Sequence, residues 1–502
     1  MADTDEPSTK LRRNLSAWDL TVFGVAVVIG AGIFTLTARV AGDFAGPSVS
    51  VAFVLAAIAC ALAALCYAEF ASTVPVAGSA YTFSYATFGE LAAWIIGWDL
   101  ILEFAVGAAA VAKGWSSYLA TVLGYVVGDG VQTTVKLGAL TVDWGALLLV
   151  VALAGLLILG TKLSSRVSLV ITSIKVVVVL FVIIAGLFFV KAANYSPFVP
   201  APAGTSASET GVNQSLLSVI AGEASSTFGV FGLLAGASLV FFAFIGFDVV
   251  ATTAEETRDP QRAVPRGILG SLAIVTVLYV AVSLVVVGMV DYTELATRTG
   301  PDGAPIRATL ATAFASNGAD WAATLISIGA LAGLTTVVMV LILGQVRVLF
   351  AMSRDGLLPR QLARTGGHGT PVRATILVSG LIAVAATFFE AGKLEEMVNV
   401  GTLFAFILVS GGVMVLRRTR PDLERGFRAP WVPVLPVVAI LACLWLMLNL
   451  TVLTWLRFVV WMAIGVVVYF VYGRHNSVLA RSGAARSVPG GSVPAERADG
   501  DG

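Results

Sequence analysis

Twelve apolar stretches, each long enough to cross a hydrocarbon core of roughly 30 Å, limit how this chain can fold more than any other feature of its sequence. Within lipid, backbone N–H and C=O groups must find partners inside the protein, so each span is expected to be helical. Charged residues make up only 12% of the 502 residues, about half the fraction of an ordinary soluble domain. We therefore predict an all-α integral membrane protein. The expected spans are residues 18–41, 48–73, 88–120, 145–160, 167–190, 230–255, 265–290, 322–350, 373–389, 397–416, 432–450 and 454–472.

Other features of the composition exclude several classes. The polar opening segment, Met1 to Ser16, lacks the apolar core of a cleavable signal peptide, so the first span is expected to stay in the protein. All three cysteines fall inside apolar spans, which suits small packing residues better than disulfides or a metal site. Basic residues form no cluster with interleaved aromatic residues, so a nucleic-acid partner is not indicated.

The distribution of Lys and Arg predicts the orientation, because cytoplasmic connections carry the excess of these residues. With a cytoplasmic N-terminus, about 22 of the 31 Lys and Arg fall in the even-numbered connections and the two tails. Only about seven fall on the other side, and Lys113 and Lys175 lie within spans. We therefore expect both termini in the cytoplasm. The lack of large soluble regions between spans suits a bacterial inner-membrane protein.

Gly30-Ala31-Gly32 lies in the middle of the first span, where a membrane helix would normally keep its hydrogen bonds intact. Two glycines one residue apart lower helix propensity and let another group approach the freed backbone. A half-helix beginning near Gly32 would present unpaired N–H groups and a partial positive charge, which can hold a carboxylate or a phosphate. The alternative is that these glycines only allow neighbouring helices to pack closely, as small residues do in membranes.

A second interruption falls at a comparable depth in the sixth span. The run from Phe241 to Asp248 places Gly246 and an acid in an otherwise apolar helix. Spans one and six open two successive sets of five spans, and paired breaks at corresponding positions are typical of transporters built from inverted repeats. The second break therefore favours a binding site over simple packing at the first.

These residues carry a family resemblance. Gly30-Ala31-Gly32-Ile33-Phe34 resembles the first-helix motif of the amino acid-polyamine-organocation (APC) superfamily, and the run from Phe241 to Asp248 resembles the sixth-helix signature of its cationic amino acid transporter branch. Further similar segments, in family order, are Leu65 to Phe70, Gly78 to Tyr81, Thr252 to Glu256, Pro260, Ala263 to Pro265 and Ser353 to Pro359. The resemblance covers roughly residues 16–472 and implies a LeuT-type fold: a 5+5 inverted repeat with 12 transmembrane helices, of which helices 1 and 6 are broken.

The organisation implied by this resemblance is a cytoplasmic tail (residues 1–16), a first repeat (17–193), an extracellular connection (194–226), a second repeat (227–417), two final helices (418–473) and a disordered cytoplasmic tail (474–502). An amino acid would bind between the unwound parts of helices one and six. The main-chain groups implied to hold it are the N–H groups of Ala31, Gly32 and Ile33 for the carboxylate, and the carbonyl groups of Ile29, Phe242, Ala243 and Ile245 for the ammonium. Opposite half-helix ends carry opposite partial charges, so main-chain dipoles can hold a zwitterion.

Lys175 lies in the apolar run from Ile171 to Val190, where a charge costs several kcal/mol unless it is satisfied. Snorkelling to the cytoplasmic interface is the plain alternative, but Arg166 is about nine residues away, roughly 13 Å along a helix. The resemblance adds that proton-coupled relatives place a lysine on helix five where sodium-coupled relatives bind an ion. The hypothesis is that Lys175 couples proton movement to substrate by contacting helix one near Ala26 to Ile29 and helix eight near Thr335.

Glu103 lies in the third span, deep enough to be unexpected unless it faces the central cavity. It could receive a cationic substrate side chain, share in proton binding, or make a hydrogen bond between packed helices. Phe244, beside the second break, could close over the substrate as a gate, although aromatic residues in membrane helices more often pack. Gating salt bridges and simple loop structure are equally open for the charged residues near cytoplasmic helix ends, Glu69, Glu255, Glu256 and Arg258.

The predicted function is secondary active transport, in which a cationic or small neutral amino acid enters the cell with a proton by alternating access. The rivals are exchange of one amino acid for another and a sensor that binds its ligand without moving it. The sequence has no nucleophile constellation, paired metal-binding carboxylates or Walker loop, so no catalytic residue, metal site or ATP-driven pump is predicted. No cofactor is expected beyond the proton as coupling ion. The expected partners are the lipid bilayer and the substrate, with arginine, lysine, ornithine and alanine as candidates.

Overall fold

The computed structural model describes residues 15–30, 32–73, 81, 89–127, 131–137, 140–159, 165–203, 211–222, 227–247, 249–250, 257–299, 305–364 and 370–478. Ala31, Asp248, Glu255, Glu256 and the segment 78–80, all singled out from the sequence, lie outside these residues. So do His368, the first fourteen residues and the tail from 479 onward.

The described part of the chain is mostly helical. Its main helices are α1 (Ala17–Val28), α2 (Thr37–Val40), α3 (Val49–Thr73), α5 (Glu90–Val127), α6 (Trp144–Ile158), α7 (Ser165–Gly186), α8 (Leu216–Ala221), α9 (Gly229–Val240), α10 (Pro260–Met289), α11 (Leu310–Ala315), α12 (Asp320–Arg354), α13 (Val372–Phe388), α14 (Ala391–Thr419), α15 (Val434–Leu448), α16 (Val452–Val468) and α17 (Arg474–Asn476). Two short antiparallel hairpins pair β1 (Thr134–Leu137) with β2 (Leu140–Asp143) and β3 (Arg298–Thr299) with β4 (Pro305–Ile306). Short 3-10 and π segments complete the path, as η1 (Gly32–Leu36), η2 (Ala41–Ala45), η3 (Gly46–Ser48), η4 (Leu187–Phe189), η5 (Ala192–Tyr195), η7 (Gly211–Asn213), η8 (Phe241–Phe244), η10 (Tyr292–Leu295), η11 (Arg360–Ala363) and η12 (Tyr469–Gly473).

Among the described residues, seven helical runs are long and apolar enough to cross a membrane by length and composition. They are Ala17–Thr73, Glu90–Val127, Val170–Phe189, Pro260–Met289, Asp320–Arg354, Ala391–Thr419 and Val452–Asn476. The first of these runs contains two of the predicted spans, and α6, α13, α15 and the run Gly229–Phe244 are shorter apolar helices. By length and composition, these helices agree with the prediction of a helical membrane protein.

Local sequence sets where several helices begin. Ser16 and Asp19 form a capping box at the start of α1: Ser16 N donates to Asp19 Oδ2 at 2.8 Å, and Asp19 N donates to Ser16 Oγ at 3.3 Å. At the start of α6, Asp143 Oδ1 accepts from Ala146 N at 3.0 Å. These side chains pair the first N–H groups of a helix, which otherwise have no partner within it.

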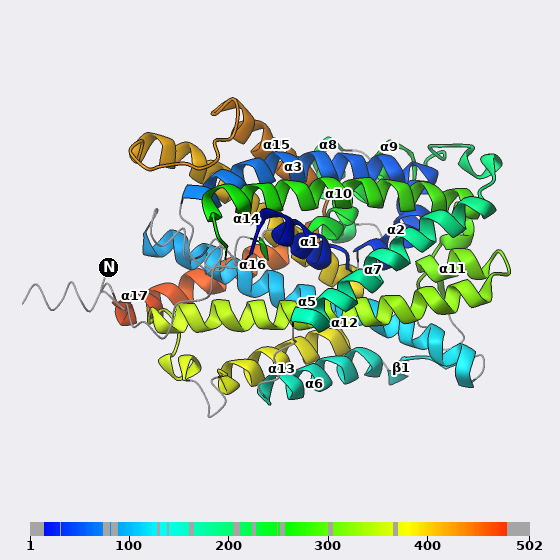
Figure 1. Cartoon of the computed structure of the whole chain (residues 1–502), viewed down its shortest axis with the longest axis horizontal. Helices are drawn as coiled ribbons and strands as arrows, with labels where there is room; N and C mark the ends of the chain where they lie inside the picture. The colour runs from blue at the N-terminus through cyan, green and yellow to red at the C-terminus, as the bar shows by residue number, and fades with distance from the viewer. Residues whose placement is uncertain are drawn as a thin grey trace, which may run out of the picture.

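Two pairs of long helices frame the molecule (Figure 1). α3 and α10 run side by side along one edge, while α5 and α12 make the most extensive helix contact and run along the other half. The short helix α1 lies near the centre and packs on α10. Small residues let these two approach, since a Cβ on Gly24 would lie 2.5 Å from Ser271 Oγ and one on Gly267 would lie 2.6 Å from Leu20 Cβ.

The described part of the predicted connection 194–226 contains η7 and α8. The boundaries differ from the sequence prediction in two places. α5 continues to Val127, several residues beyond the predicted end at 120. The expected free tail starts too early at 474, because Val478 N donates to Asp355 O at 3.0 Å and holds α17 against the end of α12.

Candidate functional site

Both predicted breaks are present in the structure. α1 ends at Val28; Ile29 N still donates to Val25 O at 2.9 Å, but Ile29 itself is extended, with ψ of 93°. Helical structure resumes at Gly32 as η1. In the second segment α9 tightens into η8, and Ile245 is extended, with ψ of 139°. Gly246 follows with φ of 112°, in the region that favours glycine, so the chain turns where a residue with a side chain would be strained.

The two breaks pack directly against each other. A Cβ placed on Gly32 would lie 2.2 Å from Ala243 Cα, and one placed on Gly246 would lie 2.9 Å from Val27 Cγ1. Each glycine therefore leaves room for the other broken segment. The packing interpretation of Gly32 is therefore supported, and the same residue lies where the helix is interrupted.

Tyr279 joins the two breaks from α10. Its hydroxyl oxygen lies 2.7 Å from Val28 O and 3.0 Å from Ala243 O, and its proton is shared between these two carbonyls. The side chain is fully buried and its ring packs against Phe244 and Phe53, with centroids 5.3 and 5.7 Å away. Tyr279 was not predicted from the sequence, because it is one of four hydroxyl-bearing residues in α10, with Ser271, Thr276 and Ser283.

A small cavity of about 40 Å³ lies beside the paired breaks. Its lining includes Gly32, Glu103, Phe242 and Ile245 of the predicted site. Ligand pockets usually measure roughly 300–1,000 Å³, so the surrounding helices must separate before an amino acid can enter. The other lining residues are Val27, Val28, Gly30, Gly107, Val111, Gly246, Val337, Leu341 and Val398.

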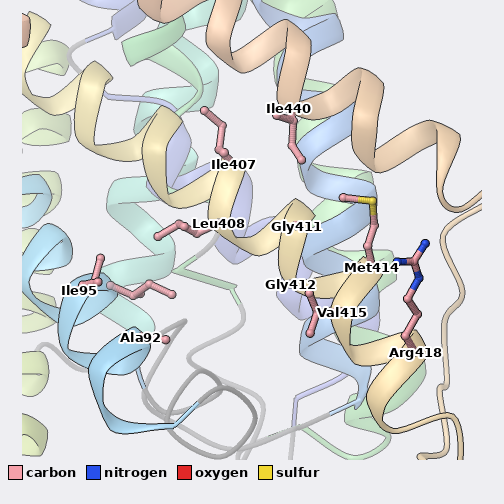
Figure 2. A pocket seen from close by; sticks show the side chains of 11 residues that line it. Ala92, Ile95, Ile407, Leu408, Gly411, Gly412, Met414, Val415, Arg418 and Ile440 are labelled. Atoms are coloured by element: carbon pink, nitrogen blue, oxygen red, sulfur yellow. The ribbon is translucent and has the colours of Figure 1, made fainter.

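Four predicted site residues do not line this cavity. Ile29, Ile33 and Phe244 are fully buried, Ala243 is 1% exposed, and none of them borders the space. Phe244 instead packs its ring against Phe53 and Tyr279, so in this conformation it has the contacts of a packing residue and not those of a gate. A larger cavity of about 630 Å³, between α5, α14 and α15, includes none of the predicted site residues (Figure 2).

Lys175 reaches the first break from α7. Its Nζ donates a hydrogen bond to Ala26 O at 2.8 Å, and the side chain is 2% exposed. The predicted contact with helix one is therefore present. On α12 the lysine stem lies against Gly333, near the predicted Thr335, since a Cβ on Gly333 would lie 2.9 Å from Lys175 Cγ. The Thr335 hydroxyl itself donates to Leu331 O. Glycine at 333 leaves the space that the lysine stem occupies.

An ion pair joins α2 and α14 and lines a second pocket. Arg39 donates to Glu395, and its Nε lies 3.8 Å from Asp43 Oδ2. Burial and then repulsion by Arg39 lower the pKa of Arg307, in the nearby loop, to about 10. Lys113 Nζ pairs with Asp143 Oδ2 at 3.3 Å in the same pocket. These partners come from segments far apart in the chain, and the sequence did not predict that they would meet.

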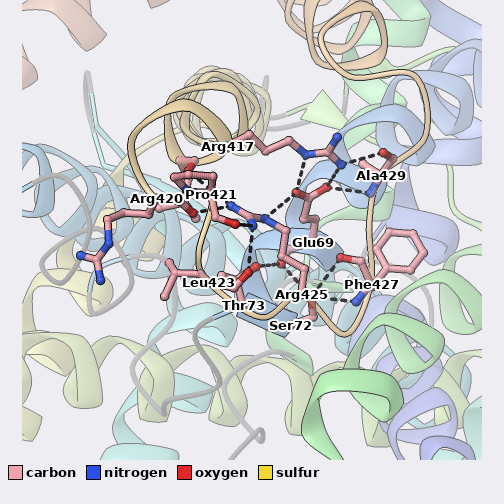
Figure 3. Close-up of polar contacts among 11 residues, drawn as sticks. Glu69, Ser72, Thr73, Arg417, Arg420, Pro421, Leu423, Arg425, Phe427 and Ala429 are labelled. Carbon is pink, nitrogen blue, oxygen red and sulfur yellow. Dashed lines mark hydrogen bonds and ion pairs between the residues drawn. The ribbon is translucent and has the colours of Figure 1, made fainter.

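Glu69 organises the opposite end of the molecule (Figure 3). Its carboxylate, which is 2% exposed, accepts from Arg417 Nε at 2.8 Å and from Arg417 Nη2 at 2.6 Å. It also accepts from Ala429 N at 2.7 Å, and Arg425 Nε lies 3.5 Å from it. Ser72 Oγ adds a link to the same segment by accepting from Phe427 N at 3.2 Å. These hydrogen bonds and ion pairs hold residues 425–429 against the end of α3.

Comparisons with known proteins cover most of the chain. A family model described as "Amino acid permease" matches residues 15–478. The chain is 42% identical to the methylthioribose transporter of Bacillus subtilis over 477 residues, 94% of this chain and 96% of that protein. It is 44% identical to the branched-chain amino acid permease BcaP of the same organism over 479 residues, 93% and 95% of the two chains. It is 38% identical to the vacuolar cationic amino acid transporter 4 of Arabidopsis thaliana over 417 residues, 82% and 64% of the two chains.

Proposed function

Because this chain belongs to the amino acid permease family, and is an amino acid transporter and not an enzyme, we propose that it takes up its substrate together with protons by alternating access. The observation that carries the proton part is the hydrogen bond from buried Lys175 to Ala26 O, at the end of α1. An amine held there, away from water, can lose a proton when the break rearranges and regain it when the break re-forms. The proton is then the only coupling ion, and no cofactor takes part.

The proposal includes the arrangement of the chain in the membrane. Twelve spans would form a LeuT-type 5+5 inverted repeat with both termini in the cytoplasm of a bacterial cell and the spans in its inner membrane. Support comes from the paired interruptions after α1 and after η8, and from their reciprocal packing through Gly32 and Gly246. In this orientation the pair Arg39–Glu395 faces outward and the Glu69 network faces the cytoplasm.

The substrate carboxylate would bind N–H groups at the start of η1, from Ala31 to Ile33. Its ammonium would bind carbonyls near Ile29 and along Phe242 to Ile245. The small cavity at this junction and the close approach of the two segments support this placement. Tyr279 holds Ala243 O in the present conformation, so the ammonium would compete for that carbonyl or displace the hydroxyl.

The cavity wall limits the choice of side chain. Most described lining residues are aliphatic or glycine, among them Val111, Leu341 and Val398, and this favours a small neutral amino acid such as alanine. Glu103 is the one charged residue among them, and it favours arginine, lysine or ornithine. Two of the reported relatives are named for branched-chain amino acids and for cationic amino acids, so both classes belong in a thermal-shift screen.

Substitution Glu103→Gln separates the two classes. Selective loss of cationic substrates supports recognition by the carboxylate. Equal loss for every substrate indicates a role in proton binding or in helix packing.

Substitution Lys175→Ala in proteoliposomes tests the proton part. We expect the variant to exchange labelled for unlabelled amino acid yet fail to concentrate it under an inward proton gradient, while Lys393→Ala, at an exposed pair with Glu390, behaves as wild type. Unimpaired gradient-driven accumulation by Lys175→Ala would remove Lys175 from this role. Exchange without accumulation in the wild type would instead identify an exchanger, and absence of all uptake a sensor.

A further inference from the structure

A cavity of about 630 Å³ lies away from the central site. It is bounded by one face of α5, the second half of α14 and one residue of α15 (Figure 2). Its walls are apolar, with Ile95 on α5, Ile407 on α14 and Ile440 on α15. An apolar space of this kind holds water poorly, because water there would find no hydrogen-bond partners.

Gly411 lines the cavity without a side chain. A Cβ built on this glycine meets no atom within 4 Å, so the space in front of α14 is open at this point. Its neighbour Gly412 also lines the cavity. The pair therefore leaves a smooth channel along the helix where side chains would otherwise project.

Arg418 stands at the end of this channel, in the last turn of α14 (Figure 2). It is the one charged residue among the described residues that line the cavity. Its neighbours Arg417 and Arg425 form ion pairs with Glu69. Arg418 itself forms no ion pair with any described residue. An exposed guanidinium at the end of a membrane-spanning helix lies at the depth of lipid headgroups.

We propose that this cavity is a binding site for an anionic phospholipid, with an acyl chain along α14 over Gly411 and the phosphate paired with Arg418. The guanidinium fork fits phosphate oxygens in a bidentate pair. The volume of about 630 Å³ is that of a small-molecule pocket. In the proposed orientation Arg418 faces the cytoplasmic leaflet, where anionic lipids attract Lys and Arg.

Native mass spectrometry of the full chain, released from detergent in the presence of dioleoylphosphatidylglycerol or dioleoylphosphatidylcholine, tests the proposal. We expect the wild-type protein to retain the phosphatidylglycerol several-fold more than the phosphatidylcholine. Arg418→Gln should abolish this preference, whereas Arg420→Gln, an exposed arginine paired with Asp422 outside the cavity, should keep it. Gly411→Leu should reduce retention of both lipids, because its side chain fills the acyl channel.

Thermal unfolding in the same detergent supplies the second measurement. The anionic lipid should raise the midpoint of the wild type and of Arg420→Gln more than that of Arg418→Gln, while inorganic phosphate alone should leave all three unchanged. Equal lipid preference in Arg418→Gln and the wild type would overturn the headgroup assignment. A full stabilisation by inorganic phosphate, or unaltered lipid retention by Gly411→Leu, would overturn the acyl-chain site.

Discussion

Ala243 occupies the space that a side chain at Gly32 would need: a Cβ on Gly32 would lie 2.2 Å from Ala243 Cα. The two residues belong to the two broken segments and are more than two hundred positions apart in the sequence. Their contact involves backbone on both sides, so it cannot be relieved by rotating a side chain. The geometry of the paired breaks therefore depends on glycine at position 32.

Substitution Gly32→Ala is expected to abolish transport. It should also lower the free energy of unfolding by about 1–3 kcal/mol, the range typical of overpacked sites. The added methyl must push the two breaks apart. Gly155→Ala in α6 is the matched control, because a Cβ there meets no atom within 4 Å, and it should transport normally. Uptake and unfolding midpoints of both variants check this. Wild-type uptake by Gly32→Ala would show that the close approach is dispensable.

Substitution Tyr279→Phe keeps the ring but removes the hydroxyl that reaches Val28 O and Ala243 O. Leaving buried carbonyls unpaired should lower the free energy of unfolding by about 1–3 kcal/mol. Tyr195→Phe removes a hydroxyl bonded to Leu284 O nearer the surface, where water can replace it, and should cost less. Denaturation in detergent compares the two. A smaller loss for Tyr279→Phe than for Tyr195→Phe contradicts the bridging role.

Substitution Glu69→Gln leaves Arg417 and Arg425 without their carboxylate. Breaking a buried ion pair from one side typically costs about 3–5 kcal/mol, so a large fall in the unfolding midpoint is expected. Asp422→Asn is the control, since its pair with Arg420 is exposed and should contribute about 0–1 kcal/mol. Equal midpoints for the two variants would mean that the Glu69 network carries no stability.

Substitution Glu395→Gln weakens the contact between α2 and α14 made by Arg39. We expect this substitution to favour conformations that are open on that side. The reporter is a cysteine in place of Ser117, which lines the adjacent pocket. It should react several-fold faster with a membrane-impermeant maleimide. The three native cysteines are buried and give little background. Glu390→Gln, at an exposed pair, should leave the rate unchanged. An unaltered rate in Glu395→Gln rules out a role in closure.

The positions of the breaks could be predicted from the sequence because they depend on local chemistry. Gly30 and Gly32 weaken one helix, Gly246 supplies a positive φ in another, and these effects act within a few residues. Lys175 could be found for a related reason, since a charge in an apolar run needs a partner wherever the run is placed. On α12 its stem lies against Gly333, two residues from Thr335, near which the contact was predicted.

Contacts between distant segments could not be predicted. Arg39 and Glu395 are both unremarkable as single charges near helix ends, and only the packing of α2 against α14 brings them together. Tyr279 shows the same limitation, because its role depends on two carbonyls that become available only once both breaks exist. The assignment of Phe244 as a gate could not be tested from the sequence, since packing and gating use the same side chain.

The hydrogen bond from Lys175 to Ala26 O has an energetic consequence. In an unbroken helix Ala26 O would accept from the N–H of Gly30, so the break releases this carbonyl and the ammonium of Lys175 takes the place of the lost donor at the negative end of α1. In the proposed mechanism the charge and the broken helix then stabilise each other. Thermodynamic reciprocity requires that a substrate which stabilises the broken helix also raises the proton affinity of Lys175. The bound proton must in turn raise the affinity for the substrate.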